Sequence, residues 1–112
     1  MTLLTEKGRE VLIDAALRGH QQIRGSLHGR QGLKEGDCAL GVMHRHYHQK
    51  IGTEEQYRWC FLPVKELVEA GYLVEQAGLI GCPDCGIRSL LHPVAHYNDE
   101  HGWDLLTIAR KC

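Results

Sequence analysis

The chain has 112 residues, of which 43% are hydrophobic and 24% are charged, with a formal net charge of −1. These values are typical of one folded, soluble domain with a thin core. No apolar run approaches the length of a membrane span, and the opening segment MTLLTEKGRE becomes charged too early for a signal peptide. We therefore expect a single domain, residues 1–112, in the cytoplasm and without a membrane partner.

Charge is divided unevenly along the chain. Residues 15–52 contain six basic and two acidic residues, a net charge of +4, whereas residues 53–104 contain three basic and nine acidic residues, a net charge of −6. A basic segment attracts phosphate and an acidic segment repels it. Two solvated surfaces that complement each other within the fold would produce the same pattern.

The first half of the chain predicts two helices around a glycine-rich segment. Thr5 is a suitable N-cap for a helix over residues 5–18, with Gly19 as its stop. Residues 21–36 contain four glycines, which predict a loop or a short hairpin. Asp37 is the expected N-cap of the next helix, which Gly52 ends. His44 and His48 share a face of that helix because they are four residues apart.

The second half predicts shorter helices. Thr53 opens a capping-box pattern, and Pro63 suits the first position of a helix that stops at Gly71. A further helix begins near Leu91, with Pro93 in its first turn. Asp104 is the N-cap of the last helix, LLTIARK, where Trp103 and Ile108 have the spacing of a hydrophobic staple. The expected fold is a small, mainly α domain of four to five short helices, with a zinc knuckle in the subregion 80–112.

The clearest chemical signal is the stretch CPDCGIRSLLHPVAHYNDEH. Cys82 and Cys85 have the Cys-x2-Cys spacing of a metal knuckle, which aims two thiolates at one point. His96 and His101 complete a Cys-x2-Cys-x10-His-x4-His pattern, close to zinc-finger spacing. His92 is the rival histidine ligand. Ligands from elsewhere that can fold back to the knuckle are Cys38, Cys60 and the pair His44 and His48.

Sulfur and nitrogen ligands favour zinc, and four protein ligands favour a structural ion over a catalytic one. An odd number of cysteines, five, in a reducing compartment points to metal ligands or buried thiols before disulfides. Neither HExxH nor HxE…PCxxC occurs in the sequence. We therefore expect one structural Zn²⁺ and no enzymatic activity.

The segments VAHYNDEHGWDLLTIARK and CALGV resemble a group of small phage- and prophage-encoded proteins of unknown function. The matching positions are His96, Asn98, Asp99, Trp103, Ile108 and Ala109, with Cys82 and Cys85 for the CPxCG knuckle that some of these proteins carry. The resemblance covers about the last third of the chain plus residues 38–42. It implies a cytoplasmic setting in a bacterial host and brings no known activity.

These features predict a non-enzymatic, zinc-stabilised protein that binds a host macromolecule, foremost a protein of the transcription or defence machinery. The alternative is a nucleic-acid-binding regulator that uses the basic segment 18–50. Its phosphate contacts would be Arg24, Arg30, Lys34, Arg45 and Lys50. A metal-dependent hydrolase ranks third, because such an enzyme needs an open coordination position and a general base.

Overall fold

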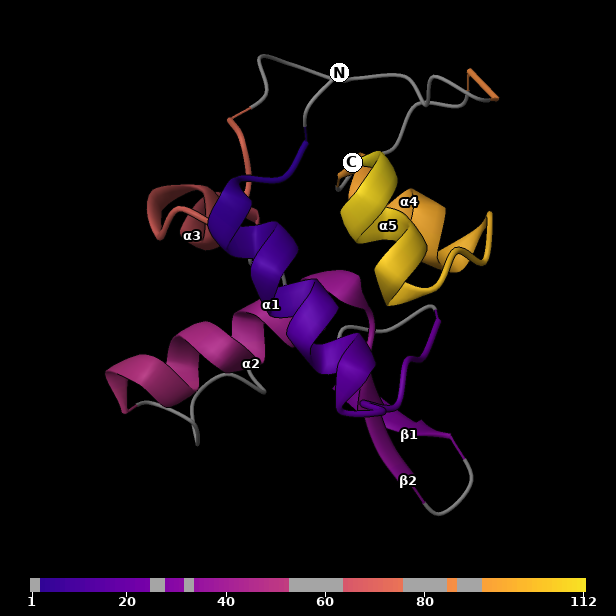
Figure 1. The fold of residues 1–112 in the computed structure, drawn as a ribbon, viewed down its shortest axis with the longest axis horizontal. Helices are drawn as coiled ribbons and strands as arrows, with labels where there is room; N and C mark the ends of the chain where they lie inside the picture. Colours follow the sequence, from indigo (N-terminus) through magenta and orange to yellow (C-terminus); the bar gives the residue numbers. More distant parts are fainter. Residues whose placement is uncertain (1–2, 25–27, 32–33, 53–63, 76–84, 87–91) are drawn as a thin grey trace.

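The computed structural model describes residues 3–24, 28–31, 34–52, 64–75, 85–86 and 92–112. Within these ranges the chain forms five helices and one two-stranded sheet, which confirms the expected mainly α fold (Figure 1). The elements in chain order are α1 (Glu6–Leu17), β1 (His28–Gln31), β2 (Lys34–Asp37), α2 (Ala39–Ile51), α3 (Val64–Glu69), α4 (Pro93–Asp99) and α5 (Leu105–Lys111).

Several predicted helix ends are confirmed by their caps. The Thr5 hydroxyl accepts a hydrogen bond from the Gly8 N–H at 3.1 Å at the start of α1. The Asp104 carboxylate accepts one from the Thr107 N–H at 2.7 Å at the start of α5. Gly52 ends α2 in the left-handed conformation, with φ 78°, which a side chain would disfavour. The predictions at Thr53 and Pro63 lie outside the described residues.

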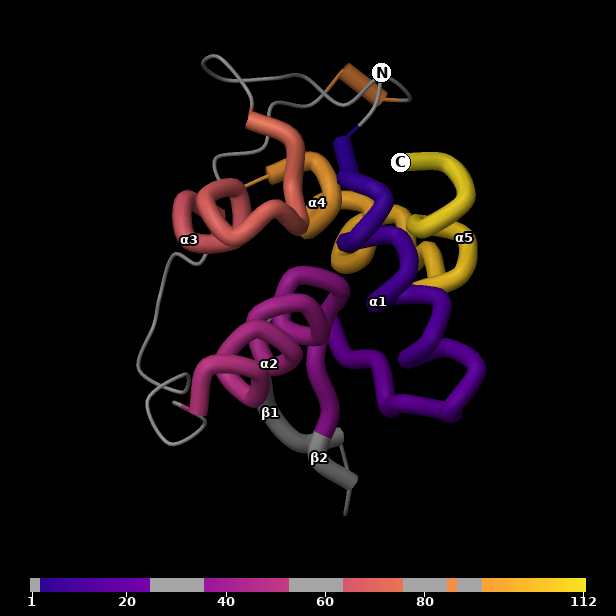
Figure 2. The backbone as a smooth tube through the Cα atoms, turned by 60° about the vertical axis from the view of Figure 1, so that its left-hand side comes forward, coloured from indigo at the N-terminus to yellow at the C-terminus, as the bar shows by residue number. Residues whose placement is uncertain are grey.

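The glycine-rich segment forms a short hairpin. Strands β1 and β2 pair antiparallel, with His28 opposite Asp37 and Gln31 opposite Lys34. Figure 1 shows this hairpin projecting from the helices at one end of the molecule. The turned view of Figure 2 shows α1 next to α5. Gly36 lies where an added Cβ would come within 2.7 Å of the Gln21 carbonyl oxygen, so the strand passes this backbone at close range.

The prediction that Asp37 caps α2 is wrong. The cap is Cys38, whose sulfur accepts from the Gly41 N–H at 3.4 Å. Asp37 belongs to β2, where its backbone pairs with residues 21–23 and its buried carboxylate contacts His20 at 2.6 Å and Arg45 at 3.0 Å. Because the Asp37 carboxylate contacts these two side chains, it does not cap the helix, which begins one residue later.

Helix α1 crosses the centre of the fold, between α2 on one side and α5 on the other (Figure 1). The N–H groups of Leu3 and Leu4 donate to the Cys112 carbonyl at 2.8 and 3.2 Å, which joins the two ends of the chain. A Cβ added to Gly8 would lie 2.1 Å from the Tyr72 carbonyl oxygen, so only glycine lets α1 approach this segment.

The side-chain amide of Asn98 is buried in the middle of this arrangement. Its oxygen accepts from the Ala39 N–H at 3.0 Å and from the Gln22 amide at 2.7 Å. Its nitrogen donates to the Ile23 carbonyl and to the Asp99 carboxylate, both at 2.8 Å. All four hydrogen-bonding positions of the amide are therefore used.

Gln22 extends the same network to the last helix. Its amide nitrogen also donates to the Trp103 carbonyl at 2.8 Å, and its oxygen accepts from the Leu105 N–H at 2.9 Å. The extended segment around residue 22 is thus bonded to the starts of both α2 and α5 through two amide side chains. Within the described residues, no helix combines the length and apolar character needed to cross a bilayer.

We expect the substitution Asn98→Ala to lower the free energy of unfolding by about 3 kcal/mol or more, because two buried backbone groups lose their partners. Chemical denaturation monitored by circular dichroism measures the change. The exposed neighbour Glu100→Gln serves as the control and should stay within about 0.5 kcal/mol of the wild type. A loss below about 1 kcal/mol for Asn98→Ala would contradict a central role for the amide.

Gly8→Ala separates helix propensity from close packing. Propensity alone predicts a gain of up to about 1 kcal/mol, since alanine favours helix interiors. The contact with the Tyr72 carbonyl predicts a loss, because the backbone must move to admit a methyl group. We expect destabilisation by at least about 1 kcal/mol in the same denaturation assay, with Glu10→Ala on the exposed side of α1 nearly neutral. A stabilised Gly8→Ala protein would show that α1 does not approach residue 72 this closely.

Candidate metal centre

Three side chains of the predicted zinc site lie together. The ligand atoms of Cys85, His96 and His101 are all within 4.8 Å of one another. The Cys85 sulfur is 3.2 Å from Nε2 of His96, and the His96 and His101 rings are 4.9 Å apart at their centroids. Cys82, the remaining predicted ligand, lies outside the described residues, and its place in the site stays a prediction of the Cys-x2-Cys spacing.

Helix α4 and the turn after it position the two histidines. His96 lies in the last turn of α4 and is buried, with 7% of its surface exposed. The chain then turns, with the N–H groups of both Glu100 and His101 directed to the His96 carbonyl. Gly102 has φ 67°, a conformation that favours glycine and lets the chain leave this turn toward α5. The turn therefore brings residue 101 back beside residue 96.

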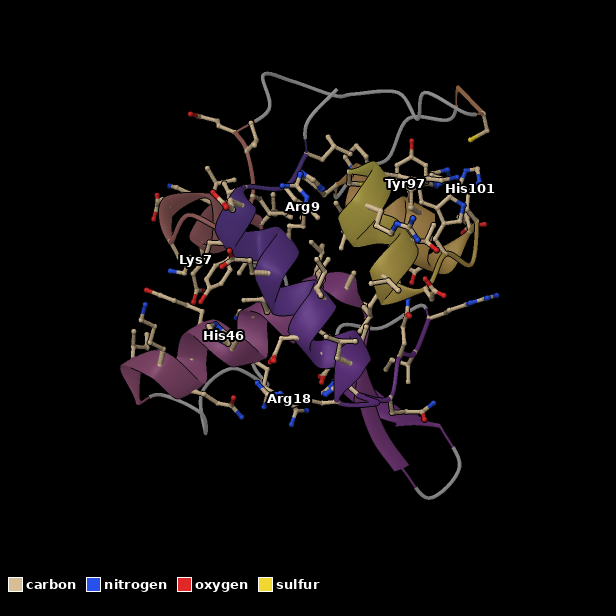
Figure 3. The ribbon with its side chains drawn as sticks, viewed as in Figure 1. Lys7, Arg9, Arg18, His46, Tyr97 and His101 are labelled. Carbon is tan, nitrogen blue, oxygen red and sulfur yellow. The ribbon has the colours of Figure 1, made fainter. Side chains whose placement is uncertain are left out.

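Aromatic side chains support one side of the site. Tyr97 and Trp103 stack with their ring centroids 4.0 Å apart and their planes within 5°. The His101 ring lies 5.3 Å from Tyr97 and 5.8 Å from Trp103. Figure 3 shows Tyr97 and His101 side by side at α4. Such packing restricts the rotation of His101 and holds its ring close to His96.

The geometry suits a tetrahedral ion with sulfur and nitrogen ligands. Zinc–sulfur and zinc–nitrogen bonds of about 2.3 and 2.0 Å at a tetrahedral angle separate the two ligand atoms by about 3.5 Å. The observed 3.2 Å between Cys85 and His96 is close to this value. Cys85 is exposed and His101 is half-buried, so an ion can reach the group from solvent. These residues could hold a metal ion.

His92, the rival ligand, has a different task. It is the N-cap of α4, where its Nδ1 accepts from the Val94 N–H at 3.1 Å. It is not part of the described group formed by Cys85, His96 and His101. Burial lowers the pKa of His92 to about 4, so the ring is neutral near pH 7 and keeps its acceptor nitrogen for the helix.

Cys38 is not part of the group either. Its thiol is buried at the start of α2, and this burial raises its pKa to about 11. The thiolate is the form that binds metal, and here it is strongly disfavoured. Cys60 lies outside the described residues.

The structure brings together a second group of possible metal ligands, of which the sequence predicted only the two histidines. His44 and His48 share a face of α2, as predicted, and the ligand atoms of these histidines and Glu66 of α3 lie within 4.8 Å of one another. Among the residues that the structure describes, the pair is not in the same group as Cys85 of the knuckle. No local sequence motif predicts Glu66 as a ligand, because only the packing of α3 on α2 brings it to the histidines.

The basic residues proposed to contact phosphate do not form one described surface. Arg45 is engaged with the buried carboxylate of Asp37. The Arg24 guanidinium lies 3.5 Å from the Gly102 carbonyl oxygen, in the turn before α5. Lys50 is exposed on α2. The side chains of Arg30 and Lys34 lie outside what the structure describes.

Comparison with protein-family models, curated proteins and solved structures found no match. The geometry of the two ligand groups and the chemistry of their side chains therefore carry the functional interpretation.

We expect His92 to make the fold acid-sensitive. Its pKa of about 4 in the folded chain is below the ordinary 6.5. The unfolded chain therefore binds more protons in this interval, and stability falls as the pH drops from about 6.5 to 4. The loss from this group approaches about 3 kcal/mol.

His92→Asn tests this expectation, because asparagine is also a good N-cap and does not titrate. Its free energy of unfolding, relative to the wild type, should improve on going from pH 7 to pH 4. The difference between the free energies of unfolding of the two proteins is taken at each pH. The contributions of the titrating groups that the two proteins share cancel in this difference. Parallel pH profiles for the two proteins would contradict the expectation.

Proposed function

We propose that this chain is a non-enzymatic protein that is stabilised by zinc and acts by binding another macromolecule, a protein of a bacterial host. In the proposed site Cys82, Cys85, His96 and His101 hold one structural Zn²⁺. The convergence of Cys85, His96 and His101 carries this proposal, because three ligands from positions 85, 96 and 101 meet within 4.8 Å. The resemblance to small phage-encoded proteins supports the bacterial setting.

A metal at this position would join Cys85 to the corner formed by α4 and α5, to which His96 and His101 belong. An ion bound by all three ligands ties the knuckle to this corner. With Cys82 as the fourth ligand the coordination shell is closed, as in structural zinc sites.

A protein partner is favoured over nucleic acid by the way positive charges are used. A shallow groove of about 150 Å³ between α1 and α2 includes Arg18 and Arg45 in its lining. Arg18 pairs with Asp14, and Arg45 pairs with Asp37. Guanidinium groups already matched with carboxylates gain less from a phosphate, and the balanced pairs lower the attraction of the whole face for nucleic acid.

Replacing the two proposed cysteine ligands tests the zinc site. We expect the double variant Cys82→Ser, Cys85→Ser, which lacks both proposed sulfur ligands, to lose the zinc. Its melting temperature should fall by several degrees, because metal binding stabilises only the folded chain. Co²⁺ substitution gives a direct readout, since a bound thiolate produces a charge-transfer band in the near ultraviolet. Cys112→Ala, which removes a buried cysteine outside the site, should keep the band. A wild-type protein without this band would refute thiolate coordination.

The choice of partner is tested by two measurements on the zinc-loaded protein. Affinity capture from bacterial lysate should retain the same protein with and without nuclease treatment. Fluorescence anisotropy with duplex DNA should show no saturable binding at low salt. Tight, steeply salt-dependent DNA binding that weakens in Lys50→Gln, together with loss of captured material after nuclease treatment, would instead favour the nucleic-acid alternative.

A further inference from the structure

We propose that His44, His48 and Glu66 form a second metal site, distinct from the cysteine site and suited to a divalent first-row transition ion such as Zn²⁺ or Co²⁺. This inference goes beyond the proposed function, and it does not depend on the cysteine site. The three side chains come from two helices, α2 and α3. Two imidazoles and one carboxylate are an established ligand set for such ions.

The two histidines present the same ring nitrogen to the same carboxylate. Nε2 of His48 is 2.6 Å from Oε1 of Glu66, and Nε2 of His44 is 3.8 Å from Oε2. The rings meet edge to face with centroids 4.5 Å apart. Ligands of a tetrahedral zinc ion lie about 3.3 Å from one another when each bond is about 2.0 Å long. One of the two observed distances is shorter than this value and the other is longer.

The burial of the group also fits a metal site. The side chain of His44 is fully buried, and that of His48 is 8% exposed, whereas that of Glu66 is 32% exposed. Solvent therefore reaches the group from the side of the carboxylate. Neutral imidazole is the form that binds metal.

The ligand count distinguishes this site from the first. Three protein ligands leave one position of a tetrahedral ion for water or another small donor, whereas the cysteine site is proposed to be closed. The absence of sulfur among these three ligands makes the site harder and gives it a different spectrum. An ion here would also join α2 to α3, which contact each other through the histidine face of α2.

Co²⁺ titration of the full chain tests the second site. We expect two Co²⁺ ions per wild-type chain, of which only one produces a thiolate charge-transfer band. In the double variant Cys82→Ser, Cys85→Ser this band should disappear while visible d–d absorption and one bound Co²⁺ remain. In His48→Gln the number of ions should fall from two to one while the thiolate band persists. The count is checked by native mass spectrometry.

Matched controls lie on the same two helices. His46→Gln removes the histidine between the two proposed ligands, and its ring contacts Tyr72 instead, at 2.7 Å from the phenol oxygen. Glu69→Gln changes an exposed carboxylate of α3, next to the proposed ligand Glu66. Both controls should keep two ions, whereas Glu66→Gln should lose one.

Failure of this site is distinguishable from failure of the cysteine site. A wild-type protein that binds a single Co²⁺ with a thiolate band overturns the second site, whether or not any variant folds. A double variant Cys82→Ser, Cys85→Ser that folds and binds no Co²⁺ also overturns it. Conversely, one Co²⁺ with d–d absorption and no thiolate band supports the second site and rejects the cysteine site.

Discussion

The fold depends on one buried side-chain amide. Asn98 satisfies the Ala39 N–H at the start of α2 and the Ile23 carbonyl in the extended segment, and it bonds Gln22, which holds the start of α5. Leaving a buried backbone group without a hydrogen-bond partner costs free energy that is a large share of the stability of a small domain. The amide thus lets three irregular segments meet inside a thin core, and it fixes the orientation of α4, which carries His96 of the candidate metal centre.

In the segment from residue 96 to residue 103, some side chains belong to the candidate metal centre and others pack within the fold. His96 and His101 face the candidate metal centre, whereas Asn98 faces the core and Tyr97 stacks on Trp103. A corner predicted from sequence as architecture and a spacing predicted as a metal site are therefore the same structure. Because the aromatic stack and the amide network both act on this corner, the histidines are held in place by packing before any ion binds. Preorganisation of this kind lowers the cost of ordering the ligands.

The histidines and basic residues of the middle segment are likewise used within the fold. The Asp37 carboxylate contacts His20 and Arg45. The Tyr72 hydroxyl contacts His46, and the Glu66 carboxylate lies beside His44 and His48. Asp37 belongs to the segment 15–52 itself, so its ion pair with Arg45 is already counted in the net charge of that segment. Glu66 comes from the acidic part of the chain, and its contacts are with histidines.

The sequence by itself determined what depends on neighbours along the chain. The caps at Thr5 and Asp104, the stop at Gly52 and the shared face of His44 and His48 follow from spacings of a few residues. The proximity of Cys85, His96 and His101 was also predictable, because these residues lie within one short stretch. The cap formed by His92 is local as well, since it bonds the Val94 N–H, but histidine is not among the preferred N-cap residues. The tertiary structure alone decided the role of Asp37, three of the four bonds of Asn98 and the place of Glu66. Each of these joins different elements of the fold, and no local pattern encodes which distant partner a buried polar group will find.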